Sequence, residues 1–288
     1  MYIRKLPKFN YHLPTSLSEA LDLLETYGLN AKMLAGGTGL LLAMKKREIE
    51  PAHLINIKAI PEMAGISEDE QGLSIGGLTT IAEIECSLII KEKYSALFDA
   101  SCVMASPQVR TLATVGGNLV SAVPCLDTGP PLIALSAQAH IASPAGERTC
   151  PVEDLFAGPS KSVLAPTDIL TRITIPSPKG KGTYIKFMKR AALDISVVGV
   201  ATQVELDNNI CSDVKIALGT AAPTPIRAIA AEEFIRGKVI TEETAAKAGK
   251  ISRTECNPRI DSFRASVEFR RNLVEVLTKR ALLNSINR

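Results

Sequence analysis

The chain has 288 residues, 46% of them hydrophobic, which is enough to build packed cores in about two domains. Its formal net charge is only +3, and its densest basic clusters, Lys45 to Arg47 and Arg270-Arg271, are typical of solvated helix faces; this argues against a nucleic-acid-binding protein. No apolar run approaches the roughly 20 residues that span a bilayer, and the start of the chain does not resemble a secretory signal, so we expect a cytoplasmic protein.

Residues 1–58 predict a small strand–helix unit with a glycine-rich turn at its centre. Ser16 and Glu19 fit a capping box that starts a helix, and Gly28 fits its end. The expected elements are a helix at 16–28, a strand at 31–34, the turn at 35–39, a helix at 40–46 and a strand at 53–57.

Residues 59–178 predict a second unit with another glycine-rich turn, Thr114 to Asn118, which follows the helix-breaking pair Ser106-Pro107. Its expected elements are a strand at 73–75, helices beginning at 80 and at 95, apolar runs at 132–135 and 139–142, and a strand at 169–175. The segment Ser177 to Gly182 is rich in proline and glycine, charged and free of apolar residues, and is therefore the clearest linker.

The remainder of the chain predicts strands followed by helices. We expect strands at 184–188, 197–206 and 214–218 and helices at 241–251 and 266–283. The fold class is therefore α+β, with one domain at 1–178, subdivided at about residue 58, and a second domain at 179–288.

The two glycine turns have the context of an anion-binding site, because a backbone without Cβ atoms can bring its N–H groups close to a phosphate. Neither turn fits a P-loop, and Leu42 occupies the position of the third glycine of the dinucleotide-binding fingerprint. The residues alone therefore leave anion binding and ordinary tight turns as equal alternatives.

Cysteine and histidine spacing predicts that this chain holds no metal. The six cysteines occur singly, without a C-x-x-C pair, and the three histidines lie far apart in the sequence. Paired cysteines are the usual mark of iron–sulfur ligation, and none occur here.

Several motifs in a fixed order resemble the flavin-binding subunits of the xanthine dehydrogenase and carbon monoxide dehydrogenase family. They cover nearly the whole chain and comprise Phe9 to Gly28, Ala35-Gly36-Gly37-Thr38, Ser106 to Arg110, Thr114 to Asn118, Asp127, Leu164 to Leu170, Lys186 with Arg190 and Asp194, Leu218-Gly219 with Pro223 to Arg227, and Ser266 to Arg270.

The resemblance implies a two-subdomain FAD-binding domain of the vanillyl-alcohol-oxidase (PCMH) type and a C-terminal α+β domain of the CO dehydrogenase flavoprotein type. It also implies a set of FAD-binding positions: the first turn would hold the pyrophosphate, Asp127 would accept hydrogen bonds from FAD hydroxyls, and Lys186 would lie near the flavin ring. The implied positions are Lys32, Met33, Leu34, Ala35, Gly36, Gly37, Thr38, Gly39, Ala105, Thr114, Val115, Gly116, Gly117, Asn118, Asp127, Leu164 and Lys186.

Three of these residues have an ordinary alternative role. Asp127 could cap the turn that follows it, Leu164 could be a core residue, and Lys186 could be an exposed lysine on an alternating strand. The chain also departs from the family at Gly39, where aspartate or serine is common, so one polar contact to FAD would be lost or replaced by backbone. The cysteine-rich loop that carries an extra cluster in benzoyl-CoA-type relatives has no counterpart here.

The function implied by the resemblance is electron transfer in a hetero-oligomer. An iron–sulfur small subunit and a molybdenum-cofactor large subunit would be the partners, and FAD would pass electrons to an acceptor such as NAD. The alternatives are a self-sufficient FAD-dependent oxidase or reductase of the same fold, and a non-enzymatic nucleotide-binding module, which would purify without yellow colour.

Overall fold

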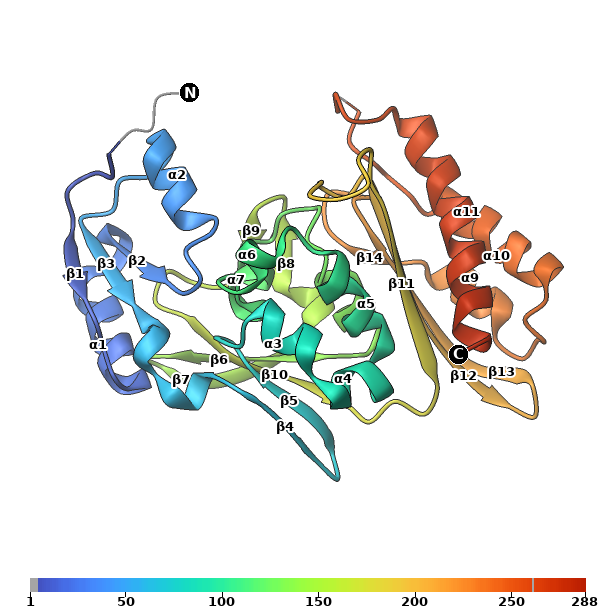
Figure 1. Cartoon of the computed structure of the whole chain (residues 1–288), viewed down its shortest axis with the longest axis horizontal. Coiled ribbons are helices and arrows are strands. Elements are labelled where there is room, and N and C mark those ends of the chain that lie inside the picture. The colour runs from blue at the N-terminus through green and yellow to red at the C-terminus, as the bar shows by residue number, and fades with distance from the viewer. Residues whose placement is uncertain (1–4, 261) are drawn as a thin grey trace.

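A computed structural model describes residues 5–260 and 262–288, and Figure 1 shows three parts that follow one another along the longest axis. The first part is a small sheet with two helices, the second a larger sheet covered by short helices, and the third a sheet covered by long helices. The α+β fold class predicted from the sequence is confirmed.

The N-terminal part is built on a parallel sheet with strand order β1-β3-β2. The Ser16 hydroxyl accepts a hydrogen bond from the Glu19 N–H at 3.2 Å, and Gly28 ends the first helix with a φ of 49°. The Glu19 carboxylate binds the Thr15 N–H at 2.8 Å, so the predicted capping box is shifted by one residue on that side. The elements are β1 (Asn10–His12), α1 (Leu17–Tyr27), β2 (Ala31–Leu34), α2 (Leu40–Lys46) and β3 (His53–Asn56), with 3₁₀ turns at Gly28–Asn30, Ile57–Ala59 and Pro61–Met63.

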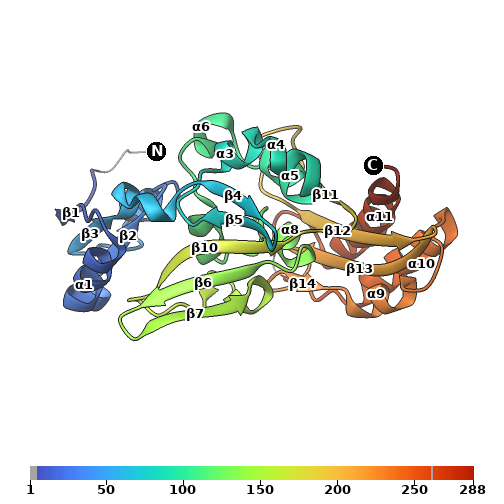
Figure 2. The same ribbon diagram turned by 90° about the horizontal axis from the view of Figure 1, so that it is seen from below.

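The central part is an antiparallel sheet with strand order β4-β5-β10-β6-β7, seen from below in Figure 2. Its strands are β4 (Ile66–Asp69), β5 (Gly72–Gly76), β6 (Gln138–Ser143), β7 (Gly146–Pro151) and β10 (Ile169–Pro176), with a separate ribbon of β8 (Phe156–Gly158) and β9 (Lys161–Ser162) after a 3₁₀ turn at Val152–Leu155. Its helices are α3 (Ile81–Cys86), α4 (Leu88–Lys93), α5 (Ser95–Val103), α6 (Pro107–Arg110), α7 (Val115–Val120) and α8 (Gly129–Ala134).

The C-terminal part is a second antiparallel sheet with strand order β11-β12-β13-β14. It contains β11 (Lys181–Phe187), β12 (Val198–Asp207), β13 (Ile210–Gly219), β14 (Ile226–Arg227), α9 (Ile229–Ile235), α10 (Glu242–Thr254) and α11 (Val267–Ile286). The predicted linker is too long at its end, because Lys181 and Gly182 already pair with β12. Gly182 is buried against Ser95, whose hydroxyl donates to the Gly182 carbonyl at 2.7 Å.

The C-terminal sheet lies between two layers of helices. Helices α5 and α8 contact the face toward the central part, while α10 and α11 lie on the other side (Figure 1). Three residues of this sheet, Tyr184, Ala201 and Ala217, belong to the same buried cluster as Leu73 and Ile75 of the central sheet. The two parts therefore share one hydrophobic core, to which β11, β12 and β13 each contribute a residue.

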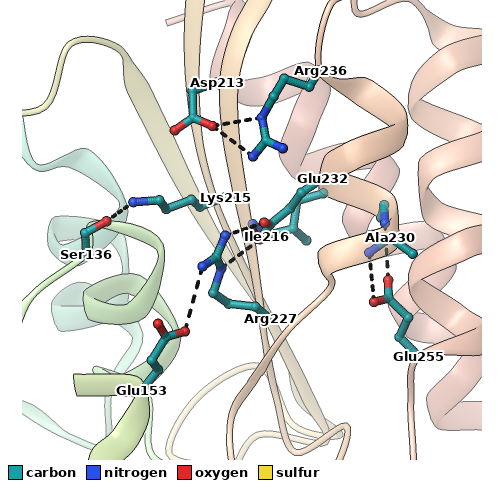
Figure 3. Close-up of polar contacts among 11 residues, drawn as sticks. Ser136, Glu153, Asp213, Lys215, Ile216, Arg227, Ala230, Glu232, Arg236 and Glu255 are labelled. Atoms are coloured by element: carbon teal, nitrogen blue, oxygen red, sulfur yellow. Dashed lines mark hydrogen bonds and ion pairs between the residues drawn. The ribbon is translucent and has the colours of Figure 1, made fainter. Parts of the chain in front are cut away.

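Polar contacts reinforce the junction, as Figure 3 shows. Lys215 of β13 donates to the Ser136 hydroxyl after α8, and Arg227 lies 3.9 Å from the Glu153 carboxylate. Arg227 also pairs with Glu232, which is 1% exposed and accepts a hydrogen bond from the Ile216 N–H at 2.8 Å. Both oxygens of this buried carboxylate therefore accept hydrogen bonds, which a buried charge requires.

Arg270 corrects one prediction from the sequence. A solvated helix face was expected at Arg270-Arg271, but Arg270 is 3% exposed. Its guanidinium donates to the carbonyls of Val197 at 2.7 Å and Thr220 at 3.2 Å and to the Ser262 hydroxyl at 2.8 Å. A paired arginine sequence does not reveal this, because two of the three acceptors lie 73 and 50 residues away in the sequence.

Candidate functional site

The first glycine turn joins β2 to α2 and leaves its backbone donors unused. The amides of Gly36, Gly37, Thr38 and Gly39 donate no hydrogen bond to a described residue. Gly37 has a φ of 77°, which favours glycine and gives the turn its tight shape. Because free backbone N–H groups that are not buried need an acceptor from outside the chain, this turn is a ready cradle for an oxyanion.

The segment that leads into the second glycine turn lies directly against the first turn. A Cβ on Gly36 would lie 2.1 Å from the carbonyl oxygen of Leu112, which shortly precedes the Thr114 to Asn118 turn. On the other side, the Gly116 N–H donates to the Gly77 carbonyl at 3.0 Å, and a Cβ on Gly116 would lie 2.6 Å from that oxygen. At Gly36 and Gly116 the missing side chain therefore makes room for protein backbone.

The two turns differ in what they can offer a ligand. The amides of Val115 and Asn118 bind the carbonyls of Thr79 and Thr114, and the Gly117 amide binds the Thr114 hydroxyl at 3.1 Å. The amides of Val115 to Asn118 are therefore already occupied, so the second turn lacks the free amides that the sequence led us to expect in both turns.

Asn118 supplies the polar group of the second turn. Its Oδ1 accepts a hydrogen bond from the Thr128 hydroxyl at 2.6 Å, while its amide nitrogen forms no hydrogen bond to a described residue. The Thr128 side chain is fully buried, so it fixes the orientation of Asn118. The second turn can therefore offer a ligand one oriented side-chain donor.

A buried ion pair adjoins Asn118 and its partner Thr128. The Asp127 carboxylate accepts from Lys186 Nζ at 2.9 Å and from the Tyr184 hydroxyl at 3.0 Å. The side chain of Lys186 is 1% exposed and that of Asp127 is 8% exposed. Burial raises the pKa of Asp127 above its usual value, and the Lys186 charge and the two hydrogen bonds oppose that shift.

This geometry decides two of the alternatives left open by the sequence. Asp127 does not cap the following helix, because both of its described side-chain hydrogen bonds go to β11. Lys186 is not an exposed lysine, because its ammonium group lies between Asp127 and the Val103 carbonyl, 3.3 Å away.

The remaining predicted positions are Ala105, Leu164 and the residues of β2. Ala105 has a φ of 48° and follows Val103, whose carbonyl binds Lys186. Leu164 is half-buried and packs against the central core. On β2, Lys32 is exposed, Met33 is half-buried and Leu34 is 8% exposed in a small core with Met44 and Leu54. Leu34 can therefore offer a ligand little more than its backbone.

Three residues of this arrangement were not singled out from the sequence. The Gly77 carbonyl accepts a hydrogen bond from Gly116 of the second turn. Thr128 orients Asn118, and Tyr184 binds Asp127. Tyr184 had a usable signal, because it lies two positions before Lys186 on a strand and therefore points to the same face. The other two are visible only once separate segments have been brought together.

The described residues contain no group of three or more histidine, cysteine, aspartate or glutamate side chains that could hold a metal ion. None of the described helices is both long enough and apolar enough to cross a membrane.

Family models match both parts of the chain. The family described as the FAD binding domain in molybdopterin dehydrogenase matches residues 7–178, and the CO dehydrogenase flavoprotein C-terminal domain matches residues 183–285. The chain is 33% identical over 279 residues to the carbon monoxide dehydrogenase medium chain of Hydrogenophaga pseudoflava, with 96% of each chain covered. It is also 33% identical over 281 residues to the putative xanthine dehydrogenase FAD-binding subunit of Escherichia coli, again with 96% of each covered.

Solved structures agree with these relatives. A chain of the Hydrogenophaga pseudoflava carbon monoxide dehydrogenase has a TM-score of 0.93 at 33% identity, with 98% of both chains covered. A chain of quinoline 2-oxidoreductase from Pseudomonas putida has a TM-score of 0.92 at 28% identity, also with 98% of both covered.

The fold and the cradle of free amides thus define a flavoprotein subunit of an oxidoreductase. The chain belongs to the family of FAD-binding subunits of the molybdenum hydroxylases, which includes those of carbon monoxide dehydrogenase and xanthine dehydrogenase, and its cofactor is FAD. The residues present fit this cofactor, because the unused amides suit a pyrophosphate and the Asp127 carboxylate suits hydroxyl donors.

Proposed function

We propose that this chain is the electron-transfer subunit that carries FAD in a molybdenum hydroxylase complex. In that complex it takes electrons from the clusters of an iron–sulfur small subunit, after a molybdenum-cofactor large subunit has oxidised the substrate, and delivers them to an external acceptor such as NAD. Relatives described as the medium chain of carbon monoxide dehydrogenase and the medium subunit of nicotine 6-hydroxylase match 96% and 98% of this chain, which supports a subunit role.

The observation that carries the proposal is the cradle of unused amides at Gly36 to Gly39, together with the oriented Asn118 side chain and the Asp127–Lys186 pair. A cofactor with a pyrophosphate, a hydroxylated chain and a ring would use all three features. We therefore keep as proposed FAD contacts Lys32, Met33, Leu34, Ala35, Gly36, Gly37, Thr38, Gly39, Ala105, Thr114, Val115, Gly116, Gly117, Asn118, Asp127, Leu164 and Lys186.

Bound FAD would supply the exchange between single electrons from the clusters and the electron pairs taken by the acceptor. The protein's contribution is binding and orientation. In the proposed arrangement the amides of Gly36 to Gly39 neutralise the pyrophosphate, and Asn118 donates beside them. Asp127 accepts from FAD hydroxyls through lone pairs that Lys186 and Tyr184 leave available, since each carboxylate oxygen has two.

The decisive experiment is expression of the chain alone and together with the products of its neighbouring genes. Each purified sample is analysed for FAD, iron and molybdenum and tested with purines, aldehydes, aromatic acids and carbon monoxide. We expect the chain alone to contain no iron or molybdenum and to oxidise none of these substrates. We expect the assembled complex to contain both metals. We also expect one of the tested substrates to reduce its flavin.

Three outcomes would overturn the proposal. Substrate turnover by the metal-free chain alone would make it a self-sufficient flavoenzyme. A complex that turns over substrate at an unchanged rate after FAD has been removed would show that electrons do not pass through this subunit. A chain that never binds FAD, alone or in the complex, would instead be a nucleotide-binding or structural module.

A further inference from the structure

Tyr184 is a buried phenol that binds Asp127, one of the proposed FAD contacts. It lies on β11, is 5% exposed, and its hydroxyl donates to Asp127 Oδ1 at 3.0 Å. Lys186, two positions further along the strand, binds the other carboxylate oxygen at 2.9 Å. One strand of the C-terminal sheet thus supplies both described side-chain partners of a carboxylate that belongs to the central part of the chain.

The neighbouring strand is shaped to admit this phenol. A Cβ on Gly199 of β12 would lie 2.5 Å from the Tyr184 hydroxyl oxygen and 3.0 Å from its ring. Real Cβ atoms essentially never approach a heavy atom that closely, so any other residue at 199 would displace the ring. Gly199 therefore provides the space in which the Tyr184 hydroxyl reaches Asp127.

We propose that Tyr184 is a positioning residue of the flavin site, which holds the Asp127 carboxylate in the orientation and ionisation state that FAD hydroxyls require. The proposal rests on the FAD-binding role proposed above for Asp127. With one donor on each oxygen, the carboxylate cannot rotate freely, and each oxygen keeps a lone pair for the cofactor. Without the phenol, Oδ1 loses its described protein donor and the carboxylate is held at one end only.

The charges around Asp127 give the proposal a pH signature. The groups that face it are Lys186 and Tyr184 from β11 and Cys125 from its own loop, and Arg264, which precedes α11, acts on the Cys125 thiol. Burial raises the pKa of Asp127, while Lys186 and the Tyr184 hydrogen bond lower it. Burial also raises the pKa of Tyr184 well above its usual value and that of Cys125, so both stay protonated. Removing the phenol therefore lets Asp127 take up a proton at a higher pH.

The test compares Tyr184→Phe with Tyr94→Phe in the assembled complex. Tyr94 is the matched control, because it is also fully buried in the same core and its hydroxyl also meets a carboxylate, Glu68, at 3.4 Å. We expect Tyr184→Phe to weaken FAD binding about tenfold at neutral pH, because a hydrogen bond to a charged group is lost. We also expect the acid limb of FAD binding to move to higher pH. Tyr94→Phe should change neither.

A double-variant cycle tests whether Gly199 acts through Tyr184. Gly199→Ala removes no polar group, yet we expect it to weaken FAD binding by displacing the phenol. If so, the losses from Tyr184→Phe and Gly199→Ala will not add in the double variant, because both remove the same hydrogen bond.

Asp127→Asn separates failure of this inference from failure of the proposed site. If Asp127→Asn binds FAD with normal affinity, the site assignment itself is wrong. If Asp127→Asn loses affinity while Tyr184→Phe keeps the wild-type affinity and pH profile, only the role of Tyr184 is overturned. A Tyr184→Phe chain that fails to fold, while Tyr94→Phe folds, would assign Tyr184 a structural role and also overturn the proposal.

Discussion

At the scale of single residues, the Asp127–Lys186 pair is the most sensitive feature of the site. Both side chains are almost completely buried, and their charged groups are 2.9 Å apart. Desolvation makes a buried ion pair a modest source of net stability, but loss of one partner leaves the other charge buried and uncompensated.

Lys186→Met should therefore destabilise the protein by about 3–5 kcal/mol, and FAD should be lost with it. Without the lysine, the pKa of Asp127 moves further above its usual value, because burial raises it and the chief opposing charge is gone. A carboxyl group with a raised pKa in the folded state contributes stability at low pH and loses it as pH rises through that pKa. The free energy of unfolding of the variant, measured by denaturant titration, should thus fall from acidic to neutral pH.

The matched control for this prediction is Lys189→Met, which changes an exposed lysine near the end of the same strand. We expect it to leave the free energy of unfolding within about 0.5 kcal/mol of the parent. Equal losses of unfolding free energy in the two variants would contradict the prediction that Lys186 and Asp127 form a buried ion pair. So would a Lys186→Met chain whose stability rises with pH.

At the scale of elements, the turn between β2 and α2 combines two demands on glycine. Gly36 must be glycine because the backbone before the second turn lies against it, and a Cβ there would lie 2.1 Å from the Leu112 carbonyl oxygen. Gly39, at the N-cap of α2, has a φ of −90°, and a Cβ there would have nothing within 4 Å. Two glycines three positions apart therefore differ sharply in what a side chain would do.

We predict that Gly36→Ala destabilises the protein by about 1–3 kcal/mol through overpacking against backbone and strongly weakens FAD binding by moving the free amides. Gly39→Ala, the matched control, should stabilise the fold by up to about 1 kcal/mol, because it reduces the freedom of the unfolded chain. Thermal unfolding and FAD titration of both variants measure the difference. If Gly36→Ala tolerates the methyl group as well as Gly39→Ala does, the backbone at Leu112 does not lie against the first turn.

At the scale of the whole molecule, the central and C-terminal parts share a core, so the flavin site depends on how they are joined. β11 brings Tyr184 and Lys186 to Asp127, and Arg270 of α11 fixes the ends of the surrounding segments. Its three acceptors lie before β12, after β13 and before α11, at Val197, Thr220 and Ser262.

Arg270→Met should therefore lower the free energy of unfolding by about 2 kcal/mol or more, because it leaves buried carbonyls without a donor. Arg280→Met removes an exposed arginine from the same helix and should have little effect. Hydrogen exchange of the assembled protein should show faster opening of the segments around Val197 and Thr220 in the first variant only. Unchanged hydrogen exchange in these two segments would contradict the proposed role of Arg270 in holding them.

The sequence by itself determined the local elements and, through its motifs, the family. Strand β2 and helix α2 have the predicted bounds, and Ser16 and Gly28 limit α1 as expected, because these signals depend on neighbouring residues. Only the tertiary structure decided that the amides of Val115 to Asn118 are occupied by Gly77, Thr79 and Thr114, while those of Gly36 to Gly39 donate to no described residue.

The burial of charged residues was also decided only by the tertiary structure. Asp127, Lys186 and Arg270 look like ordinary surface or turn residues in the sequence, yet all three are buried with partners many positions away. The local sequence pattern indicates which face of a strand or helix a side chain occupies. Whether that face meets solvent or another part of the chain depends on how the central and C-terminal sheets pack together, because burial and hydrogen bonding at this junction arise from contacts that no single segment contains.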